Sequence, residues 1–410
     1  MAQEGRAAAY SSLMQQAPSP APTGPLPGRS QPILVGITTA LVGFTSSFAV
    51  VLAGLRAVGA SLAQATTGLI VLCAVIGLAT LWLSTRHRLP ITLARSTPGA
   101  AVLVAAGAVD GGWPAAVGAF LLVGLLLVAT AVVPGLGRLV QAIPAPVAHA
   151  MLAGVLLTIC LKTVTALVAI PLVVGPVVLL WLLLVRYAPR WSTPVAFAVA
   201  LAIAAGLALA EGRGIAVQAP TFTPTIPSFS VAALVGIAIP LWVVTVASQH
   251  VPGVAVMGSF GHRVPWKETL VVTGAGTLFG AAGGAHAINL AAITAALPAS
   301  EESHPDATRR WIAAHTAGWT YLVLALLVPV MTGLAADAPP GLLEAIAGLA
   351  LLGTLGASLS SAMEVPSRRV PAVTAFLVAA SGVVVAGIGS TFWGLIAGLL
   401  VWWLLSPRKV

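Results

Sequence analysis

The stretch from Arg95 to Pro98 combines a fixed positive charge with the start of a helix. Ser96 and Thr97 carry hydroxyls of the kind that cap helix N-termini, and Pro98 is favoured in a first helical turn. Residues 91–94 before it are apolar and partly β-branched, which predicts a short extended piece. Free N–H groups at a helix start favour an anion. We therefore expect Arg95, Ser96, Thr97 and Pro98 to contact an anionic ligand.

A second stretch, residues 283–294, follows the same plan about 194 positions later. It has a Gly-Gly break, a short linker containing His286, then Asn289, which can cap a helix, and a short apolar run. Paired interrupted segments at matching places in two halves of a membrane chain indicate a transport site. We expect two half-helix starts to face each other, with His286 and Asn289 at the site. The alternative is a pair of kinked packing helices.

Three more side chains are candidates for ligand contact. Gln249 lies in a polar cluster within a long uncharged run, and Thr45 and Phe48 lie in the related run of the first half. Polar groups at membrane depth usually face a cavity or another helix. We expect Gln249 and Thr45 to reach the ligand and Phe48 to lie against its apolar part. A hydroxyl bonded to its own backbone is the alternative for Thr45.

Proton coupling needs a group that changes charge, and few such groups lie in the apolar runs. Among the histidines there, His250 and His286 flank the predicted site, and Glu344 begins a later apolar run. These three are the proton-coupling candidates. Arg95 has no acid near it in sequence, so a ligand carboxylate is its expected partner. The alternatives for Arg95 are snorkelling toward water and bonding to backbone carbonyls.

The composition tells where these residues must lie. Of 410 residues, 59% are hydrophobic and 7% are charged, and the mean hydropathy is +1.03. So few polar residues cannot cover a soluble domain of this size, which excludes a soluble enzyme, a disordered protein and a nucleic-acid-binding protein. Cys73 and Cys160 both lie in apolar runs, so we expect no disulfide, no metal and no cofactor.

Cutting the chain at Gly, Pro and charged clusters gives about fourteen segments, each near the length of about 20 residues that a membrane span needs. The predicted starts are Pro32, Ser61, Pro90, Gly112, Pro144, Ile170, Thr193, Phe229, Lys267, Gly283, Arg310, Pro340, Pro371 and Thr391. Local matches at a near-constant shift indicate two repeats of about seven spans, with chance similarity as the alternative. An odd number of spans inverts one repeat relative to the other. The expected fold is an all-α integral membrane protein with interrupted third and tenth spans.

The expected domain boundaries follow from these segments. Residues 1–31 form a Pro-rich polar tail, predicted to be disordered and cytoplasmic, and residues 211–228 form an outer linker. The repeats cover residues 32–210 and 229–406. With the N-terminus in the cytoplasm, most of the 19 Lys and Arg residues fall on the cytoplasmic side, as the positive-inside rule requires. Both termini are then cytoplasmic.

The same stretches resemble the benzoate transporter (BenE) family. The resemblance rests on Leu89-Pro90-Ile91 with Ser96-Thr97-Pro98-Gly99, on Ala247-Ser248-Gln249-His250, and on Gly283-Gly284-Ala285-His286-Ala287-Ile288-Asn289. It runs from about residue 32 to the end of the chain. It implies an inner-membrane symporter that imports an aromatic carboxylate, benzoate, together with protons. The expected partners are this substrate, protons and the lipid bilayer, with no nucleic acid. The oligomeric state is open, with a homodimer as one option.

This family is similar to nucleobase and sulfate carriers with seven-plus-seven inverted repeats. That similarity implies a core domain of spans 1–4 and 8–11 and a gate domain of spans 5–7 and 12–14. The nucleobase carriers hold substrate and proton on acids in spans eight and ten, where this chain has Gln249 and Asn289, so their proton route does not carry over. Arg95 also departs from the family pattern, which has an aromatic residue there.

Rival interpretations remain. They are a carrier of another organic or inorganic anion or of a nucleobase, a channel, and a membrane-embedded enzyme. The last would need paired acids for a metal or a diphosphate, and the apolar runs contain none.

Overall fold

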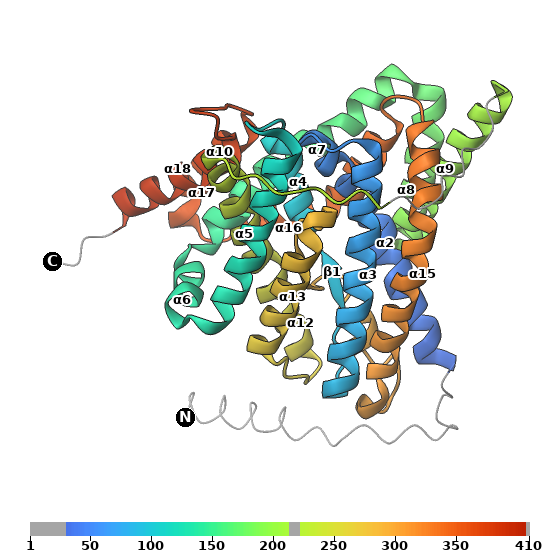
Figure 1. The fold of residues 1–410 in the computed structure, drawn as a ribbon, viewed down its shortest axis with the longest axis horizontal. Helices are drawn as coiled ribbons and strands as arrows, with labels where there is room; N and C mark the ends of the chain where they lie inside the picture. The colour runs from blue at the N-terminus through green and yellow to red at the C-terminus, as the bar shows by residue number, and fades with distance from the viewer. Residues whose placement is uncertain (1–29, 213–221, 407–410) are drawn as a thin grey trace, which may run out of the picture.

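The computed structural model describes residues 30–212 and 222–406, which form helices, two short strands and connecting loops (Figure 1). The first half contains α2 (Ser30–Ala57), α3 (Leu62–His87), β1 (Leu93–Arg95), α4 (Thr97–Ala106), α5 (Gly112–Val132), α6 (Pro134–Ala142), α7 (Ala145–Ala169), α8 (Pro171–Tyr187), η1 (Pro189–Trp191) and α9 (Ser192–Ala210). The second half contains α10 (Val231–Ala233), η2 (Leu234–Ala238), α11 (Ile239–Thr245), η3 (Val246–His250), α12 (Val251–Ser259), α13 (Trp266–Gly280), η4 (Ala281–Gly283), β2 (Ile288–Leu290), α14 (Ala296–Ala299), η5 (Ala307–Arg309), α15 (Trp311–Ala336), α16 (Leu342–Met363), η6 (Pro366–Arg368), α17 (Arg369–Ala380) and α18 (Ser390–Leu405).

The helices have the lengths and composition of membrane spans. Among the described residues, eight helical segments are long and apolar enough to cross a bilayer, and α4, α8 and α18 are apolar but shorter. A helix or strand begins within three residues of every predicted segment start, although η4, β2 and α14 divide the tenth segment. The architecture is that of a multi-pass membrane protein, and the count of fourteen spans stays a prediction.

Small residues let the long helices approach closely. A Cβ added at Gly77 of α3 would lie 2.8 Å from the carbonyl oxygen of Gly318 on α15. The same addition at Gly124 of α5 would lie 2.6 Å from the backbone nitrogen of Leu278 on α13. Apolar side chains gain little by leaving lipid, so close backbone packing of this kind is what holds membrane helices together.

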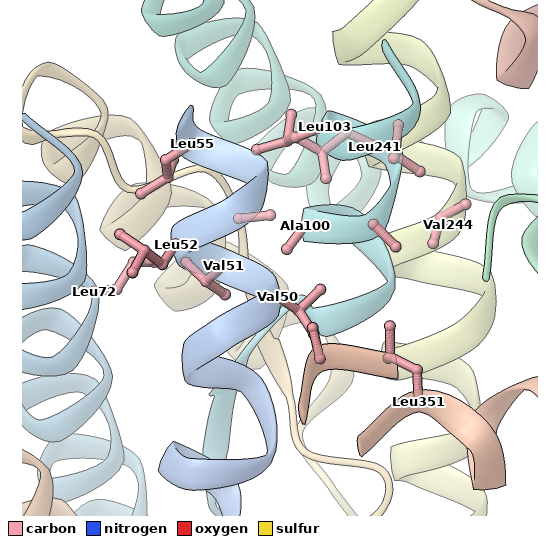
Figure 2. Packing of buried hydrophobic residues seen from close by; sticks show 14 of the residues in the cluster. Val50, Val51, Leu52, Leu55, Leu72, Ala100, Leu103, Leu241, Val244 and Leu351 are labelled. Atoms are coloured by element: carbon pink, nitrogen blue, oxygen red, sulfur yellow. The ribbon is translucent and has the colours of Figure 1, made fainter. Parts of the chain in front are cut away.

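Helix α2 stands between two groups of helices. It packs against α3, α4 and α15 of one group and against α9 and α16 of the other. Beyond them, α5 packs on α13 in the first group, while α16 and α17 pack on α7 in the second. Figure 2 shows the junction, where Val50 and Leu55 of α2 lie among Leu72 of α3, Leu103 of α4 and Leu351 of α16. These side chains are buried, so α2 joins the two groups through a continuous apolar core.

The strands β1 and β2 pair in antiparallel fashion. Arg95 lies opposite Ile288, Ala94 opposite Asn289 and Leu93 opposite Leu290. The ladder continues past the strands, because the Ser96 N–H donates to the Ala287 carbonyl at 3.0 Å. The extended pieces predicted for the two interrupted segments are therefore confirmed, and they meet each other.

Two threonine hydroxyls accept hydrogen bonds from backbone N–H groups at the outer edges of this strand pair. The Leu93 N–H donates to Thr80 Oγ1 on α3 at 3.2 Å, and the Ile288 N–H donates to Thr277 Oγ1 on α13 at 3.0 Å. An unpaired backbone N–H inside a membrane costs several kcal/mol. The hydroxyls therefore allow a two-stranded sheet to exist within a helical protein.

The predicted linker and tail are only partly described. Residues 222–228 of the linker run without secondary structure across the ends of α3, α5 and η4. Trp113 Nε1 donates to Thr225 Oγ1 at 2.7 Å, and the Thr225 N–H donates to the Ala282 carbonyl at 2.8 Å. The predicted tail lies outside the described residues except for Ser30 and Gln31, which already belong to α2.

The segment Val231–Ser259 is one continuous helix that contains two π-helical turns, η2 and η3. A π-turn holds one residue more than an α-turn and is frequent at functional sites. Gln249 and His250 close η3, so two predicted site residues lie on this irregular turn.

Candidate functional site

Helix α4 begins with a complete set of local capping contacts. Ser96 Oγ accepts the Gly99 N–H at 3.1 Å, and the Thr245 hydroxyl on α11 donates to Ser96 Oγ at 2.9 Å. The predicted Ser96 cap is confirmed, although Thr97 rather than Pro98 opens the helix. A Cβ at Gly99 would clash with Leu241 Cδ1 of α11 and would lie 2.7 Å from Ser96 Oγ, so glycine is needed for α11 to pack on this helix start.

Arg95 is a buried cation that has no acidic partner among the residues the structure describes. Its side chain is 2% exposed, Nη1 donates to Cys73 Sγ at 3.8 Å, and Cζ lies 4.7 Å from the centre of the Phe44 ring. Nε and Nη2 have no hydrogen-bond partner among the described residues. Neither snorkelling nor bonding to backbone carbonyls therefore applies. A guanidinium keeps its charge, so this environment favours the binding of an anion.

Arg95 and Asn289 project to opposite sides of the strand pair. Side chains alternate along a strand and paired residues share a side, so Arg95 lies with Ile288 and Asn289 lies with Ala94. We call these sides the arginine face and the asparagine face. The arginine face meets α2 and α3 through Phe44 and Cys73. A ligand group that touches both faces has to lie at the end of the strand pair, where α4 starts.

An aromatic row leads away from Arg95. The ring centres of Phe44 and Phe48 are 5.5 Å apart, and those of Phe48 and Phe197 are 5.0 Å apart. All three side chains are buried, and Phe197 belongs to α9. The row therefore reaches from the arginine face across α2 to the second group of helices, and it offers ring faces and edges to an aromatic ligand.

Asn289 does not cap a helix, contrary to the prediction. It lies within β2, where Nδ2 donates to the Leu290 carbonyl at 2.8 Å and Oδ1 has no partner among the described residues. Helix α14 starts only at Ala296, has four residues and has no side-chain cap. Residues 291–295 contain no proline and include two β-branched residues, which disfavour an earlier start. The unpartnered Oδ1 of Asn289 is an acceptor, which suits a hydroxyl, a water or a carboxylic acid.

The two histidines have different surroundings, although both are fully buried. His286 Nε2 lies 3.0 Å from the Ser96 carbonyl oxygen. Because a carbonyl only accepts, Nε2 carries the hydrogen, and the unpartnered Nδ1 is the atom that can take a second proton. His286 is therefore tied to the residue that directly follows Arg95. His250 has no partner among the described residues at either nitrogen and lies edge-on to Trp266, 6.2 Å between ring centres.

The remaining predicted residues are Gln249, Thr45 and Glu344. Gln249 is 7% exposed and its amide makes no hydrogen bond to a described residue, so it is free to bind a ligand. The Thr45 hydroxyl donates to the Leu41 carbonyl at 2.8 Å, which is the alternative that the sequence left open. Glu344 accepts the Gly341 N–H at 3.1 Å and caps α16. Glu344 is not among the residues gathered at the strand pair.

Sequence reasoning missed several members of the site. Phe44, Cys73 and Phe197 meet the predicted residues only through contacts between distant segments, so no local pattern marks them. Thr245 had a local signal, since it belongs to the same polar cluster as Gln249. Within residues 30–212 and 222–406, no three His, Cys, Asp or Glu side chains are grouped as metal ligands.

Two surface hollows of the molecule lie away from the strand pair. They measure about 470 and about 180 Å³, and both are lined by Glu302. Glu302 pairs with Arg190 of η1 at 2.7 Å, and the Gln31 amide donates to the Glu302 carbonyl at 2.7 Å. The hydrogen bond and the charge of Arg190 hold the pKa of Glu302 below its ordinary value. Arg95 and Asn289, by contrast, are sealed from solvent in this conformation.

Comparison with known proteins adds a family and a fold. The sequence model of a family described as "Benzoate membrane transport protein" matches residues 29–404. The chain is 38% identical over 371 residues to the inner membrane protein YdcO of Escherichia coli, covering 89% of this chain and 93% of that protein. It is 28% identical over 336 residues to a benzoate membrane transport protein of Acinetobacter baylyi, covering 80% and 83% of the two chains.

Two solved structures resemble the fold. The transmembrane domain of the cyanobacterial bicarbonate transporter BicA matches with a TM-score of 0.57 and 17% identity, covering 90% of this chain and 97% of that one. The structure of SLC26A9 matches with a TM-score of 0.57 and 14% identity, covering 90% of this chain and 65% of that one. Both likenesses concern the fold alone. The family match identifies a membrane transporter and not an enzyme.

Proposed function

The chain belongs to the BenE family of benzoate membrane transport proteins, and from this premise we propose that it imports an aromatic carboxylate, benzoate, across the inner membrane together with protons. The observation that carries the proposal is the meeting of a buried cation and an aromatic row. Arg95 offers two unpartnered N–H groups, and Phe44, Phe48 and Phe197 continue from it. Benzoate has the matching chemistry, a carboxylate joined to a ring.

In the proposed site the carboxylate lies against Arg95 at the start of α4. Thr97 opens that helix and is half-buried, whereas its neighbours Ser96 and Pro98 are buried. The ring would replace part of the contact between Phe48 and Phe197, which are 5.0 Å apart. Gln249 would approach from η3, because β2 packs against that turn. A small inorganic anion would use Arg95 but gain nothing from the aromatic row.

Proton coupling is proposed to run through His286. A proton on Nδ1 of His286 would be repelled by Arg95, because His286 is tied to the residue that directly follows Arg95. A carboxylate bound to Arg95 would offset that repulsion, so substrate and proton would favour each other's binding. His250 and Glu344 stay as candidates, but His250 bonds to nothing described and Glu344 caps α16.

Transport is proposed to move a core domain of spans 1–4 and 8–11 against a gate domain of spans 5–7 and 12–14. The packing supports this grouping, since α3 pairs with α15 and α5 with α13, while α7 pairs with α16 and α17. The antiparallel strand pair is what two inverted repeats would produce. Cytoplasmic termini follow from the distribution of Lys and Arg. The homodimer stays a prediction.

The test is uptake of radiolabelled benzoate into proteoliposomes, with and without an inward proton gradient. We expect accumulation that a protonophore abolishes. His286→Gln keeps a donor for the Ser96 carbonyl but takes up no proton, so it should bind benzoate within about three-fold of wild type and lose gradient-driven accumulation. Phe197→Leu should weaken benzoate more than acetate.

The same uptake assay is repeated with bicarbonate, sulfate and uracil, both as competitors of benzoate and as labelled substrates. If folded protein accumulates one of these and not benzoate, the substrate assignment is wrong although the family assignment stands. Downhill benzoate flux that a proton gradient cannot drive would instead remove the coupling.

A further inference from the structure

A second cationic site lies on the outside of the molecule, where α3 ends and α15 begins. The Arg88 guanidinium lies 4.4 Å over the ring of Trp311, the first residue of α15. Arg88 is exposed and makes no hydrogen bond or ion pair with a described residue. The nearby acid, Glu268, is already paired with Arg86 at 3.1 Å and with His87 at 2.9 Å. Arg88 therefore presents its N–H groups without a counter-charge from the described chain.

The backbone holds Arg88 in an unusual conformation. Arg88 follows the last residue of α3 with φ 52° and ψ 35°, in the left-handed region where glycine or asparagine normally ends a helix. A non-glycine residue is strained in this region. The left-handed turn directs the side chain onto Trp311, and such local strain is a common mark of a functional position.

A rigid aromatic column continues from Trp311 along α15. Trp311, His315 and Trp319 follow at four-residue spacing, with ring centres 5.7 and 6.5 Å apart. Trp319 Nε1 donates to His315 Nε2 at 3.2 Å, so the neutral imidazole carries its hydrogen on Nδ1, 3.1 Å from Thr85 Oγ1. Thr85 then accepts this hydrogen bond and keeps its own hydroxyl hydrogen free, one turn before Arg88.

The column opens onto an apolar surface. Trp82 and Trp319 are both 57% exposed, and the stripe continues with Leu78, Val323 and Leu326, each more than half exposed. Tryptophan at this position is typical of the membrane interface, and the stripe is typical of a lipid-facing helix surface. A flat cation at the head of an apolar stripe matches a phosphate headgroup with an acyl chain below it.

We propose that Arg88, Thr85 and the Trp311–His315–Trp319 column form a binding site for one anionic phospholipid. The guanidinium and the Thr85 hydroxyl bind the headgroup phosphate, and an acyl chain lies along Trp82, Trp319 and Val323. The net negative charge of the lipid supplies the counter-charge that the described protein residues do not give Arg88. The site lies outside the strand pair and does not depend on the transported substrate.

The test is native mass spectrometry of the full, delipidated chain in detergent. It is titrated with phosphatidylglycerol or with phosphatidylethanolamine of the same acyl composition. We expect one phosphatidylglycerol to bind in preference. Arg88→Gln should weaken that binding about five-fold, the factor expected for one basic residue at an anionic surface. Trp311→Leu, which keeps the charge but removes the stack, should also weaken it. Arg56→Gln is the control, because Arg56 is an exposed arginine at the end of α2 and no described aromatic ring is stacked on it.

Three results would overturn the proposal. They are equal retention of the two lipids, an equal loss in Arg56→Gln and Arg88→Gln, and an unchanged preference in Arg88→Gln that elutes as a folded, monodisperse protein. A further titration uses glycerol phosphate in place of a lipid. If it occupies Arg88 as tightly as phosphatidylglycerol does, the site is a soluble phosphate site and not a lipid site.

Discussion

The two interrupted segments occupy matching places in the chain but differ in structure. In the first, a single residue separates β1 from α4, a helix of ten residues that Ser96 caps. In the second, five residues separate β2 from α14, a helix of four residues with no side-chain cap. The favourable interaction of an anion with a helix start needs aligned peptide groups behind it. Of the two segments, the first therefore offers a helix start to an anion.

The difference comes from local capping chemistry. Ser96-Thr97-Pro98 starts a helix at once, whereas Ala291 and the four residues after it contain neither a proline nor an early cap. What the second segment contributes is side chains, namely the free acceptor of Asn289 and the protonatable Nδ1 of His286. Two segments with one backbone plan can thus supply different chemistry to one site.

Among substitutions that test this comparison, we expect the largest change in benzoate affinity at Arg95. Arg95→Met should weaken benzoate binding about thirty-fold or more, because removing one partner of a buried charge pair costs about 2–5 kcal/mol. The ligand-free protein should become more stable, because an unpaired buried charge is gone. Binding titration and thermal unfolding without ligand measure the two quantities.

The control for Arg95 is Lys162→Met, which removes a cation from an exposed position on α7. Unchanged benzoate affinity in Arg95→Met would assign the anion site to another cation.

The next effect is expected at the helix start. Ser96→Ala removes the cap of α4 and leaves the Thr245 hydroxyl without its acceptor. A lost cap costs about 1 kcal/mol, so benzoate binding should weaken about five- to ten-fold. Thr294→Ala, at the matching approach to α14, should change it less than two-fold, because no side chain caps that helix. The same titration measures both variants. An equal loss of benzoate affinity in the two would mean that both helix starts contribute equally to binding.

A smaller effect should come from the asparagine face. Asn289→Leu removes an acceptor that bonds to nothing described, so binding should weaken only about three-fold. Because Arg95 and Asn289 project to opposite faces, their effects should add to within about 0.5 kcal/mol. A double-mutant cycle on benzoate affinity measures this. A larger coupling would mean that both side chains touch one ligand group.

The smallest effect concerns the loop that follows α14, which Glu302 ties to Arg190 of η1. The lowered pKa of Glu302 means that the ion pair stabilises the fold above the ordinary carboxyl pKa and that this contribution is lost as the pH falls through the lowered value. Arg190→Gln should lower the unfolding temperature slightly at pH 7. The difference from wild type should begin to shrink as the pH falls below the ordinary carboxyl pKa of about 4.3 and should vanish below the lowered value. A difference that grows in acid would contradict the assignment.

Much of the architecture could be predicted from the sequence because its causes are local. Uncharged runs separated by Gly and Pro locate the segments, and Ser96 before Thr97-Pro98 locates a helix start. The short α14 was missed because hydropathy does not report capping. Phe197 was missed because it joins the aromatic row through a contact with Phe48, far away in the chain. The opposite faces of Arg95 and Asn289 needed the strand register, since a shift of one residue would have put them on the same face.

The π-turn η3 sets which side of the following helix, in the eighth predicted segment, faces the strand pair. Deleting one residue from Val246–His250 would turn it into an ordinary α-turn and rotate everything after it by about 100°. Gly253 now faces β2 so closely that a Cβ would lie 2.8 Å from the Ala291 carbonyl oxygen, and that rotation would replace it with a larger neighbour. A single insertion or deletion here, without any substitution, would therefore exchange the set of side chains that this helix presents to the strand pair.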